Sequence, residues 1–538
     1  MKYPIEAKIT MTGVRIKDSV PDPYPEERPT VYADRIGQWY LAQQSLTRRK
    51  QLGQYLTPVG IADFMAGLFS VRGKNVRLLD PGAGSGILSC AVCEHLASEQ
   101  SPPLILVLDV YETDHKFCAV LKKALVYLGN YLAQKHITFK SNIYCEDFVL
   151  KHARLLDNCR GLFEIKDVEQ GYDLCISNPP YFKITKADPR ARASHAVVCG
   201  QPNIYSLFMV LSACLLRNDG EMVFITPRSF ASGSYFRRFR ERFFGLMKPQ
   251  RIHVFESRRD AFKRDEVLQE NIIIKARREI ARKEHAVYIS CSAGVPEARR
   301  NDSRKVSLAS ILDMTTKEKA LKIPCNGRQE SVLEKVGNWN GFLNDYGLQI
   351  STGPVVPFRA ERFLAESADA RGDYAPLLWM QNVEAMRLNW PKKNCGKPQY
   401  IKIQSRSLRL LVPDATYVLL RRFSAKEEAR RLTAVPLLAG SLGAELIGIE
   451  NHLNYVHKPG GTLTWDEAWG LAVLYNSDFM NEYFRALNGS TQVSATEIRS
   501  IPLPPLEVII EIGKAVRALR KPYEEVEPQV AHLLTNAM

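Results

Sequence analysis

The stretch VRLLDPGAGSGILSC, residues 76 to 90, decides the fold class of this 538-residue chain. An apolar run ends at Asp80, glycines follow at positions 82, 84 and 86, and an apolar helical pattern comes next. Glycines after a strand let the backbone pass close to a ligand, and the start of the following helix supplies free N–H groups. Because many cofactors use this kind of turn, its surroundings must indicate which ligand it serves.

Strand and helix patterns alternate around this stretch. Apolar runs typical of buried strands cover 76–80, 104–111, 137–144, 172–177 and 222–226, and helical patterns lie near 86–98, 115–134 and 204–216. This alternation predicts β-α-β units, and therefore an α/β domain with a mostly parallel, Rossmann-like sheet. The runs RIHVF (251–255) and NIIIKA (271–276) fit antiparallel strands added at the end of that sheet.

Shifts in composition divide the chain into three segments. Residues 1–35 read as an irregular lead-in, residues 36–295 as the α/β domain, and residues 296–538 as a separate strand-rich α+β domain. Early in the second segment QYLTP divides two helical patterns, and Thr57 is a candidate cap for a helix opened by Pro58. The roughly 35 residues before the α/β domain are too few for a nuclease domain.

The composition is that of an ordinary globular protein with surplus positive charge. The chain is 45% hydrophobic and 24% charged, with a net charge of +15 that favours polyanionic partners. Its 11 cysteines are scattered, which is typical of thiols in a reducing compartment. We interpret Cys90 and Cys93 as buried residues that pack a helix against the core. No second cysteine pair follows Cys90 and Cys93 at zinc spacing, so we expect no metal site. Neither a signal peptide nor a membrane span is evident, so we expect a cytoplasmic protein.

Acidic residues stand at three successive strand ends. Asp80 closes the first predicted strand, Glu112 follows the second, and Asp147 follows the third. The carboxyl ends of parallel strands meet at one edge of a sheet, where doubly wound folds bind ligands. Glu112 could accept hydrogen bonds from two ribose hydroxyls, and Asp147 from an adenine amino group. The sequence therefore predicts a nucleoside-containing cofactor at this edge.

The fourth strand ends in Asn178-Pro179-Pro180-Tyr181, which can neither extend a sheet nor start a good helix. Asn178 offers a side-chain carbonyl, and Pro179 keeps its backbone carbonyl while lacking an N–H, so the turn presents two acceptors. Two acceptors can hold both hydrogens of one NH₂ group and aim the nitrogen lone pair at an electrophile. Tyr181 adds a flat face for stacking, worth roughly 1–3 kcal/mol per base. The turn therefore predicts an amine substrate.

In chain order these motifs resemble the amino-methyltransferases that use S-adenosylmethionine, and among them the N6-adenine DNA methyltransferases of type II restriction–modification systems. The resemblance covers most of the chain and is strongest to the subgroup with a C-terminal target-recognition domain. GQPNIYSLFMV (200–210) matches the helix that follows the catalytic motif. YFRALNGSTQVSATEIRSIPLPP (483–505) is similar to the close of the recognition domain in enzymes like the PstI and BsuBI methyltransferases.

The resemblance implies roles for individual residues. At the cofactor it implies Thr57 near the methionine moiety, Asp80, Gly82, Gly84 and Gly86 in the glycine motif, Glu112 on the ribose, Asp147 on the adenine, and Asn178 beside them. At the reacting base it implies Asn178, Pro179, Pro180 and Tyr181 as the catalytic motif, with Phe262 packed against the base. A core position beneath a hairpin is the alternative for Phe262.

The resemblance also implies a reaction and partners. The enzyme would bind double-stranded DNA, extrude one adenine and methylate its N6 in one in-line step, because a paired amine cannot reach both the Asn178 turn and the cofactor. It would act as a monomer in the bacterial or archaeal cytoplasm, at the nucleoid, and protect sites from a partner restriction endonuclease. Residues 296–538 would read the target sequence.

Basic residues gather in two segments. Residues 228–288 hold 16 Lys and Arg against 8 Asp and Glu, and residues 402–431 hold 8 against 3. The first segment suits phosphate contacts beside the catalytic motif, although RRFRERFF within it may equally form an amphipathic helix with a solvated face. Base-reading residues are expected from the C-terminal domain.

Other functions share the amine-holding turn. Protein glutamine methyltransferases and RNA amine methyltransferases use the same NPPY arrangement, but a peptide substrate does not explain the large C-terminal domain. A non-catalytic DNA-binding module is opposed by the intact Asn178 and Tyr181. A subunit that needs a separate specificity protein is opposed by that same C-terminal domain.

Overall fold

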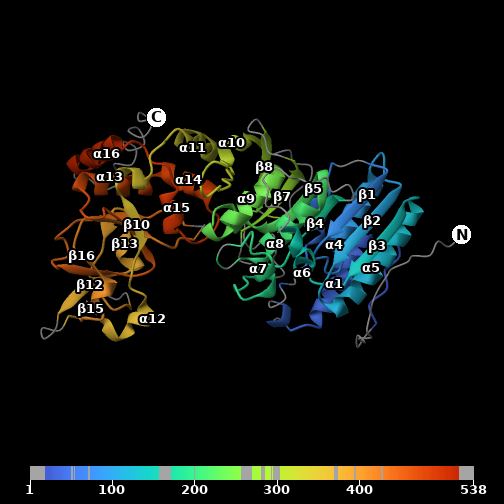
Figure 1. Cartoon of the computed structure of the whole chain (residues 1–538), viewed down its shortest axis with the longest axis horizontal. Helices are drawn as coiled ribbons and strands as arrows, with labels where there is room; N and C mark the ends of the chain where they lie inside the picture. The colour runs from blue at the N-terminus through green and yellow to red at the C-terminus, as the bar shows by residue number, and fades with distance from the viewer. Residues whose placement is uncertain are drawn as a thin grey trace. The chain divides into compact units, whose positions relative to one another are not determined.

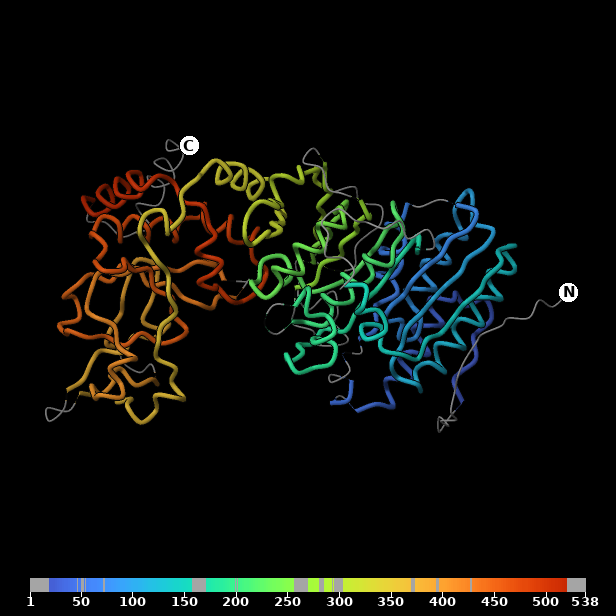
Figure 2. Tube along the Cα trace, viewed as in Figure 1, coloured from blue at the N-terminus to red at the C-terminus, as the bar shows by residue number. Residues whose placement is uncertain are grey.

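The computed structural model forms two compact units, Met1–Leu321 and Lys322–Met538. Figure 2 traces the chain through both units. We call them the N-terminal and the C-terminal unit and describe each by itself. The structure describes residues 19–45, 47–49, 53, 55–70, 73–156, 171–198, 200, 202–255, 270–279, 285–292, 294, 303–368, 373–392, 396–425 and 428–519.

The described strands of the N-terminal unit form one nine-stranded sheet in the order β3-β2-β1-β4-β5-β7-β6-β8-β9 (Figure 1). Strands β1 to β5 pair in parallel, and β7 is antiparallel to both β5 and β6, as the sequence predicts for the later strands. The bounds are β1 (Asn75–Asp80), β2 (Ile105–Tyr111), β3 (Thr138–Tyr144), β4 (Tyr172–Ser177), β5 (Leu216–Pro227), β6 (Met247–Phe255), β7 (Asn271–Arg278), β8 (Ala286–Ser292) and β9 (Arg304–Ser307).

The strand order reverses between β1 and β4. From β1 the chain adds β2 and β3 on one side, and then returns to place β4 and β5 on the other. The two strands pair directly, with Leu78 opposite Leu174 and Leu79 opposite Cys175. Ligands of doubly wound sheets bind outside the carboxyl ends of the strands at such a reversal. The glycine loop after β1 and the NPPY turn after β4 therefore lie at the same crevice.

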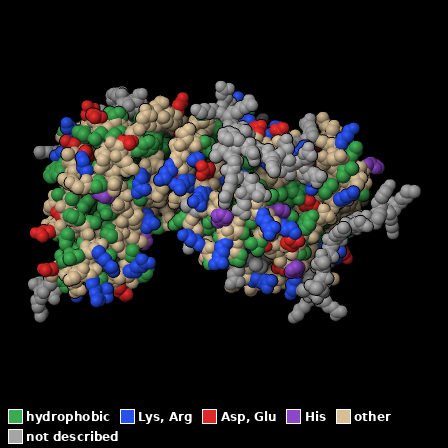
Figure 3. Space-filling model, in the orientation of Figure 1, with side chains coloured by type: hydrophobic (Ala, Val, Ile, Leu, Met, Phe, Trp, Pro, Cys, Tyr) green, Lys and Arg blue, Asp and Glu red, His purple; other side chains and the backbone are tan. Residues whose placement is uncertain are grey.

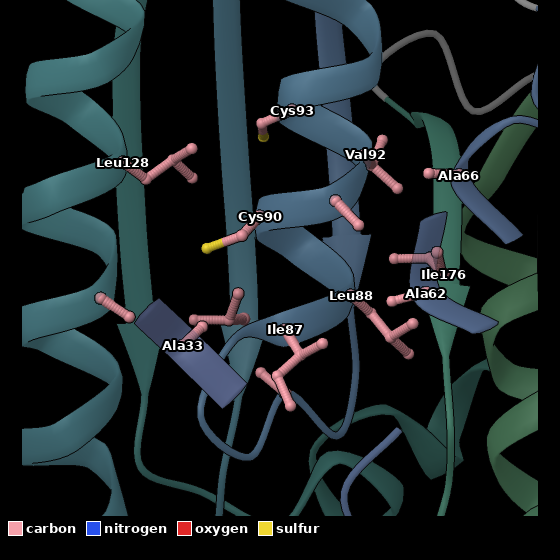
Figure 4. Close-up of a cluster of buried hydrophobic side chains, with 14 of the residues drawn as sticks. Ala33, Ala62, Ala66, Ile87, Leu88, Cys90, Val92, Cys93, Leu128 and Ile176 are labelled. Carbon is pink, nitrogen blue, oxygen red and sulfur yellow. The ribbon is translucent and has the colours of Figure 1, made fainter. Parts of the chain in front are cut away.

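Two groups of helices cover this sheet. Helices α1, α3, α4 and α5 pack on one another, and so do α6, α8 and α9. Leu78 and Ile176 belong to the core beneath the first group, shown in Figure 4, while Leu79 and Cys175 alternate to the other side. The bounds are α1 (Pro29–Ala42), α3 (Val59–Ala66), α4 (Ile87–Ser98), α5 (His115–Gln134), α6 (Phe148–His152), α7 (Pro189–Ala193), α8 (Ile204–Leu215), α9 (Arg237–Leu246) and α10 (Leu308–Ile311).

The cysteines of this unit follow the sequence prediction in part. Cys90 and Cys93 are buried on α4 within the core of Figure 4, as predicted for helix packing. The expectation that every cysteine is a thiol is wrong for one pair, because a disulfide joins Cys118 to Cys145. Parallel pairing of β2 with β3 brings the start of α5 beside the end of β3, with the two Cα atoms 6.6 Å apart.

The borders of the N-terminal unit differ from those expected from composition. Helix α1 begins at Pro29, inside the segment taken as an irregular lead-in, and the unit ends after Leu321 rather than at residue 295. The later border follows from strand pairing, since β9 adds to the sheet beside β8. It also follows from Arg240, whose buried guanidinium donates to the carbonyl oxygen of Glu318 across 2.8 Å.

The C-terminal unit combines short strands with helices. Its larger sheets have the orders β10-β20-β17-β18 and β11-β15-β12-β19-β16, and helices α13 and α16 pack together. No helix within the described ranges of the chain is long and apolar enough to span a membrane. The bounds are α11 (Gly327–Gly337), β10 (Gln349–Thr352), α12 (Pro357–Ala360), β11 (Leu364–Ala365), β12 (Tyr374–Leu378), β13 (Val383–Glu384), β14 (Arg387–Leu388), β15 (Tyr400–Lys402), β16 (Leu411–Pro413), β17 (Tyr417–Arg421), β18 (Ala434–Leu437), β19 (Leu446–Ile449), β20 (Leu453–His457), α13 (Trp465–Asn476), α14 (Asp478–Leu487), α15 (Ala495–Arg499) and α16 (Leu506–Leu519).

Candidate active site

A cavity of about 260 Å³ opens at the reversal of strand order in the N-terminal unit. It brings together residues from the ends of four parallel strands, which are far apart in the sequence. Of the site residues predicted from the sequence, the cavity is lined by Gly82, Gly84, Glu112, Asp147, Asn178 and Pro180.

The glycine loop needs glycine for different reasons at different positions. Gly84 and Gly86 have φ angles of +56° and +88°, a left-handed backbone that other residues adopt only with strain. A Cβ on Gly86 would also lie 2.9 Å from the Leu121 side chain on α5. A Cβ on Gly82 would meet only ordinary contacts. Gly82 lines the cavity, so the lack of a side chain there leaves more of the cavity open.

Asp80 lies beneath the glycine loop rather than in the cavity lining. It is completely buried, and one carboxylate oxygen accepts a hydrogen bond from the Ser89 hydroxyl across 2.7 Å. Burial raises the pKa of Asp80 to about 7, against the opposing effect of the Ser89 hydrogen bond. Asp80 thus joins the glycine loop to the first turns of α4, and its predicted contact with the cofactor stays a prediction.

The Glu112 carboxylate connects two loops at the wall of the cavity. One oxygen accepts from the backbone N–H of Gly84 across 3.1 Å, and the other accepts from the N–H of Asp114 across 2.9 Å. Burial raises the pKa of Glu112 to about 7, while these N–H donors act in the opposite direction. Carboxylate oxygens have further lone pairs, so Glu112 can still accept hydrogen bonds from a ligand in the cavity.

Asp147 has a local structural partner and a cationic neighbour. One oxygen caps α6 by accepting from the Leu150 N–H across 3.0 Å. The other lies 3.8 Å from the guanidinium of Arg190, which also forms a close ion pair with Asp188. Asp147 therefore faces the cavity from a fixed position, with Arg190 beside it in the lining.

The amide of Asn178 is held in one orientation. Its Nδ2 donates to the carbonyl oxygen of Tyr55 across 3.3 Å and to the hydroxyl oxygen of Thr57 across 3.1 Å. A backbone carbonyl can only accept, so the atom beside Tyr55 must be the nitrogen and not the oxygen of the amide. Oδ1 of Asn178 consequently points away from these two residues, as an acceptor for a donor at the NPPY turn.

Tyr181 supplies such a donor. Its hydroxyl lies within hydrogen-bonding distance of Asn178 Oδ1 and 2.8 Å from the carbonyl oxygen of Ile225 on β5. Burial holds the pKa of Tyr181 well above its usual value, so the hydroxyl keeps its proton. One proton serves one acceptor at a time, and the Ile225 carbonyl gives this hydroxyl an alternative partner when Asn178 binds another donor.

The QYLTP segment folds onto the NPPY turn. Gly53 has a φ angle of +62°, and a Cβ there would lie 2.9 Å from the Pro180 side chain. Thr57 is buried and does not cap a helix: α3 begins at Val59, with Pro58 in the capping position and without a side-chain cap. The expected capping role is therefore wrong, because the Thr57 hydroxyl is directed to Asn178 instead. Its predicted contact with a methionine moiety stays a prediction.

Several lining residues were not predicted, and one predicted residue cannot be placed. Arg190 stands 5.6 Å over the Phe182 ring, and both follow the NPPY turn in the sequence. Nothing in their spacing distinguishes them from surface residues of a loop. Phe262 lies outside the described residues. Unpredicted residues of the lining include Gly53, Tyr55, Phe117, Phe148, Phe182, Arg190 and Phe208.

The basic segment 228–288 is not uniformly exposed. Arg228 pairs with Glu270 across 3.3 Å in the interior, and Lys275 pairs with Glu221 across 3.1 Å. Arg240 and Arg278 are buried and donate to backbone carbonyls. The expectation of phosphate contacts is therefore wrong for these four residues, because their charges are buried and bound to partners within the unit.

Comparison with known proteins places the chain in a family. Residues 110–262 match the family model of the Eco57I restriction-modification methylase. The chain is 34% identical over 472 residues to the type II methyltransferase M.BsuBI of Bacillus subtilis, covering 88% of this chain and 91% of that protein. It is 32% identical over 475 residues to the type II methyltransferase M.PstI of Providencia stuartii, covering 87% and 90%.

The chain also matches solved structures at low sequence identity. The type IIG restriction endonuclease BpuSI superposes with a TM-score of 0.41 and 14% identity, over 94% of this chain and 67% of that one. The sequence relationship is the more informative, since it spans nearly the full length of both relatives. This chain belongs to the type II methyltransferases of restriction–modification systems, the family of M.BsuBI and M.PstI. It is therefore a methyltransferase.

Proposed function

We propose that this protein is a site-specific DNA methyltransferase that transfers a methyl group from S-adenosylmethionine to N6 of an adenine flipped out of duplex DNA. The observation that carries the proposal is the fixed amide of Asn178, which is part of the lining of a cavity it shares with Glu112 and Asp147. An acceptor for an amine and two acceptors suited to a nucleoside thus meet in one crevice.

The residues around the cavity fit S-adenosylmethionine. Glu112 offers acceptors for ribose hydroxyls, Asp147 offers one for the adenine amino group, and Gly82 leaves space beside them. Phe117, Phe148 and Phe208 supply apolar surface for the ring system. When bound, this cofactor supplies a methyl group on a positively charged sulfur, which makes the methyl carbon electrophilic.

The NPPY turn would hold the amine that accepts this methyl group. Asn178 Oδ1 and the Pro179 carbonyl oxygen each accept one hydrogen of the NH₂ group, which directs the nitrogen lone pair into the cavity. Each hydrogen bond contributes only about 0.5–1.5 kcal/mol net, so much of the acceleration comes from orientation. The proton leaves the nitrogen after transfer, and no general base is required.

Flipping and target recognition follow from the same geometry. An N6 amine paired inside a duplex cannot reach Asn178, so the adenine must leave the stack, and Tyr181 offers a ring against which it can lie. We assign sequence recognition to the C-terminal unit, residues 322–519 of the described chain. The enzyme would work as a monomer and protect its sites from a partner restriction endonuclease.

A methyl-transfer assay with three substrates tests the proposal. Tritium from labelled S-adenosylmethionine should enter duplex DNA and be recovered as N6-methyladenine, while RNA and release-factor protein stay unlabelled. Asn178→Ala should abolish transfer and leave duplex binding within about twofold, because the amide positions the amine and does not hold the duplex. Label in protein or RNA alone would instead indicate the glutamine or RNA amine reaction and would end the DNA proposal.

A further inference from the structure

The chain makes a closed excursion directly after the NPPY turn. Lys183 forms a β-bridge with Asn203, and the Ile184 N–H donates to the Pro202 carbonyl oxygen across 3.0 Å. We call residues 183–203 the post-NPPY loop and describe its residues 183–198, 200, 202 and 203. Its two ends are therefore fixed to each other, and it includes the short helix α7. The loop is placed by the same turn that presents Asn178.

Uncompensated positive charge is concentrated on this loop. It contains four Lys or Arg residues and one acid, Asp188, whose carboxylate is occupied by Arg190 through hydrogen bonds of 2.7 and 2.9 Å. Lys183, Lys186 and Arg192 are exposed, and none of the described acidic side chains forms an ion pair with them. Three cations are thus free for an outside partner. Figure 3 shows Lys and Arg side chains in the region where Figure 1 labels α7.

Elements behind the loop hold it in place. On α9, Arg238 lies 3.3 Å from the Val198 carbonyl oxygen and 3.5 Å from that of His195. Tyr235, in the turn before α9, packs against the backbone of Gly200, where an added Cβ would lie 2.4 Å from its ring. Tyr235 is nevertheless 57% exposed. The loop that bears the three exposed cations is therefore also packed against a solvent-facing aromatic ring, and cations and aromatic rings together suit nucleic acid.

The loop borders the cavity. Phe182, the residue immediately before it, and Arg190, within it, both belong to the cavity lining. A target nucleotide that enters the cavity keeps its backbone outside, so the flanking phosphates must lie close to the rim. Exposed Lys and Arg without acidic partners bind phosphates by releasing condensed counterions. Buried residues such as Arg228 and Arg240, which the sequence marked for this role, cannot do so.

We propose that the post-NPPY loop is the surface that holds the phosphate backbone of duplex DNA beside the target nucleotide, through Lys183, Lys186 and Arg192. The inference rests on the proposed function for the identity of the partner. It goes further by assigning the phosphate contacts to a particular loop of the N-terminal unit. These contacts position the duplex and carry no sequence information.

The test compares two variants with equal loss of charge. The loop variant combines Lys183→Ala, Lys186→Ala and Arg192→Ala. The control combines Lys74→Ala, Lys122→Ala and Lys140→Ala, which are also exposed and lie before β1, on α5 and on β3. Duplex affinity is measured by fluorescence anisotropy between 50 and 300 mM salt. The slope of log Kd against log salt should fall by about 2–3 in the loop variant, since each phosphate contact contributes roughly 0.9, and should stay near wild type in the control.

The outcomes separate this inference from the proposed function. The assignment of phosphate contacts to the loop would be overturned if the loop variant kept the wild-type slope. It would also be overturned if the slope fell as much in the control as in the loop variant. Wild-type protein without salt-dependent duplex binding would overturn the proposed function itself. Binding of S-adenosylhomocysteine, measured by calorimetry, reports that the fold is intact. If the triple variant does not fold, Lys186→Ala and Arg192→Ala are tested singly, and each should lower the slope by about 1.

Discussion

The side-chain nitrogen of Asn178 donates a hydrogen bond to the hydroxyl oxygen of Thr57 across 3.1 Å. The two residues are far apart in the sequence, on the NPPY turn and the QYLTP segment. The Tyr55 carbonyl, which can only accept, determines which end of the amide faces the NPPY turn, and Thr57 gives the same nitrogen a second acceptor. The NPPY turn and the QYLTP segment are therefore coupled through the Asn178 amide.

Thr57→Val should slow methyl transfer while leaving cofactor affinity largely unchanged. The substitution keeps the shape but removes the acceptor. The hydrogen bond that orients the Asn178 amide is worth about 1 kcal/mol, so kcat should fall about fivefold. Thr57→Ser restores the hydroxyl and should recover most of the rate. Steady-state kinetics gives kcat and the KM for S-adenosylmethionine separately. A higher KM at unchanged kcat would favour a methionine contact for Thr57 instead.

Tyr181→Phe should lower the rate of methyl transfer only slightly, and Tyr181→Ala should lower it much more. The hydroxyl can move between Asn178 Oδ1 and the Ile225 carbonyl, so its loss leaves Oδ1 available and should change single-turnover rates by less than about threefold. Removing the ring loses roughly 1–3 kcal/mol of stacking on the flipped base, or about 5- to 160-fold in rate. Equal damage in both variants would show that the hydroxyl carries the function.

Cofactor binding should weaken as the pH falls through 7. Glu112 has its pKa raised to about 7 by burial, and only the ionised carboxylate accepts from both ribose hydroxyls. The ionised fraction drops from about nine-tenths at pH 8 to about one-tenth at pH 6, so the Kd should rise about tenfold. Calorimetry with S-adenosylhomocysteine at both values checks this. Glu112→Gln should bind more weakly and lose the pH dependence; an unchanged dependence would assign it to another group.

Arg431→Met should destabilise the C-terminal unit. Arg431 is buried, and its guanidinium donates to Ser424 Oγ across 3.0 Å and to the carbonyl oxygens of Asn488 and Ser490. The variant leaves these buried acceptors without a donor, which should cost about 2–5 kcal/mol. Hydrogen exchange in peptides from this unit gives the local free energy of unfolding. Arg409→Met, the same change at an exposed position, should lie within about 0.5 kcal/mol of wild type.

Features that depend on local sequence could be predicted well. The strand 172–177 and the helix 115–134 have the bounds that the pattern predicts, since apolar periodicity and flanking polar residues mark both ends. The glycine loop and the NPPY turn could be assigned to one crevice because parallel strands order their ends. Gly84 and Gly86 do adopt the left-handed backbone for which glycine is suited.

Features that depend on tertiary contacts could not be predicted. Thr57 looks like a helix cap in the sequence, and only the folded chain directs its hydroxyl to Asn178. Arg240 reads as part of a solvated helix face, although its partner, the carbonyl of Glu318, holds it in the interior. Arg190 reaches the cavity because Asp188 and Asp147 position it. A charge pattern alone cannot distinguish a buried Arg from one that meets phosphate.

The attachment of β9 to β8 sets a practical limit on dissecting this protein. A recombinant piece that stops at residue 295 would leave the outer edge of β8 open to pairing with other chains, which promotes aggregation. The same piece would also leave the Arg240 guanidinium without the Glu318 oxygen that neutralises part of its burial cost. Expression of the catalytic half by itself should therefore extend at least to Leu321.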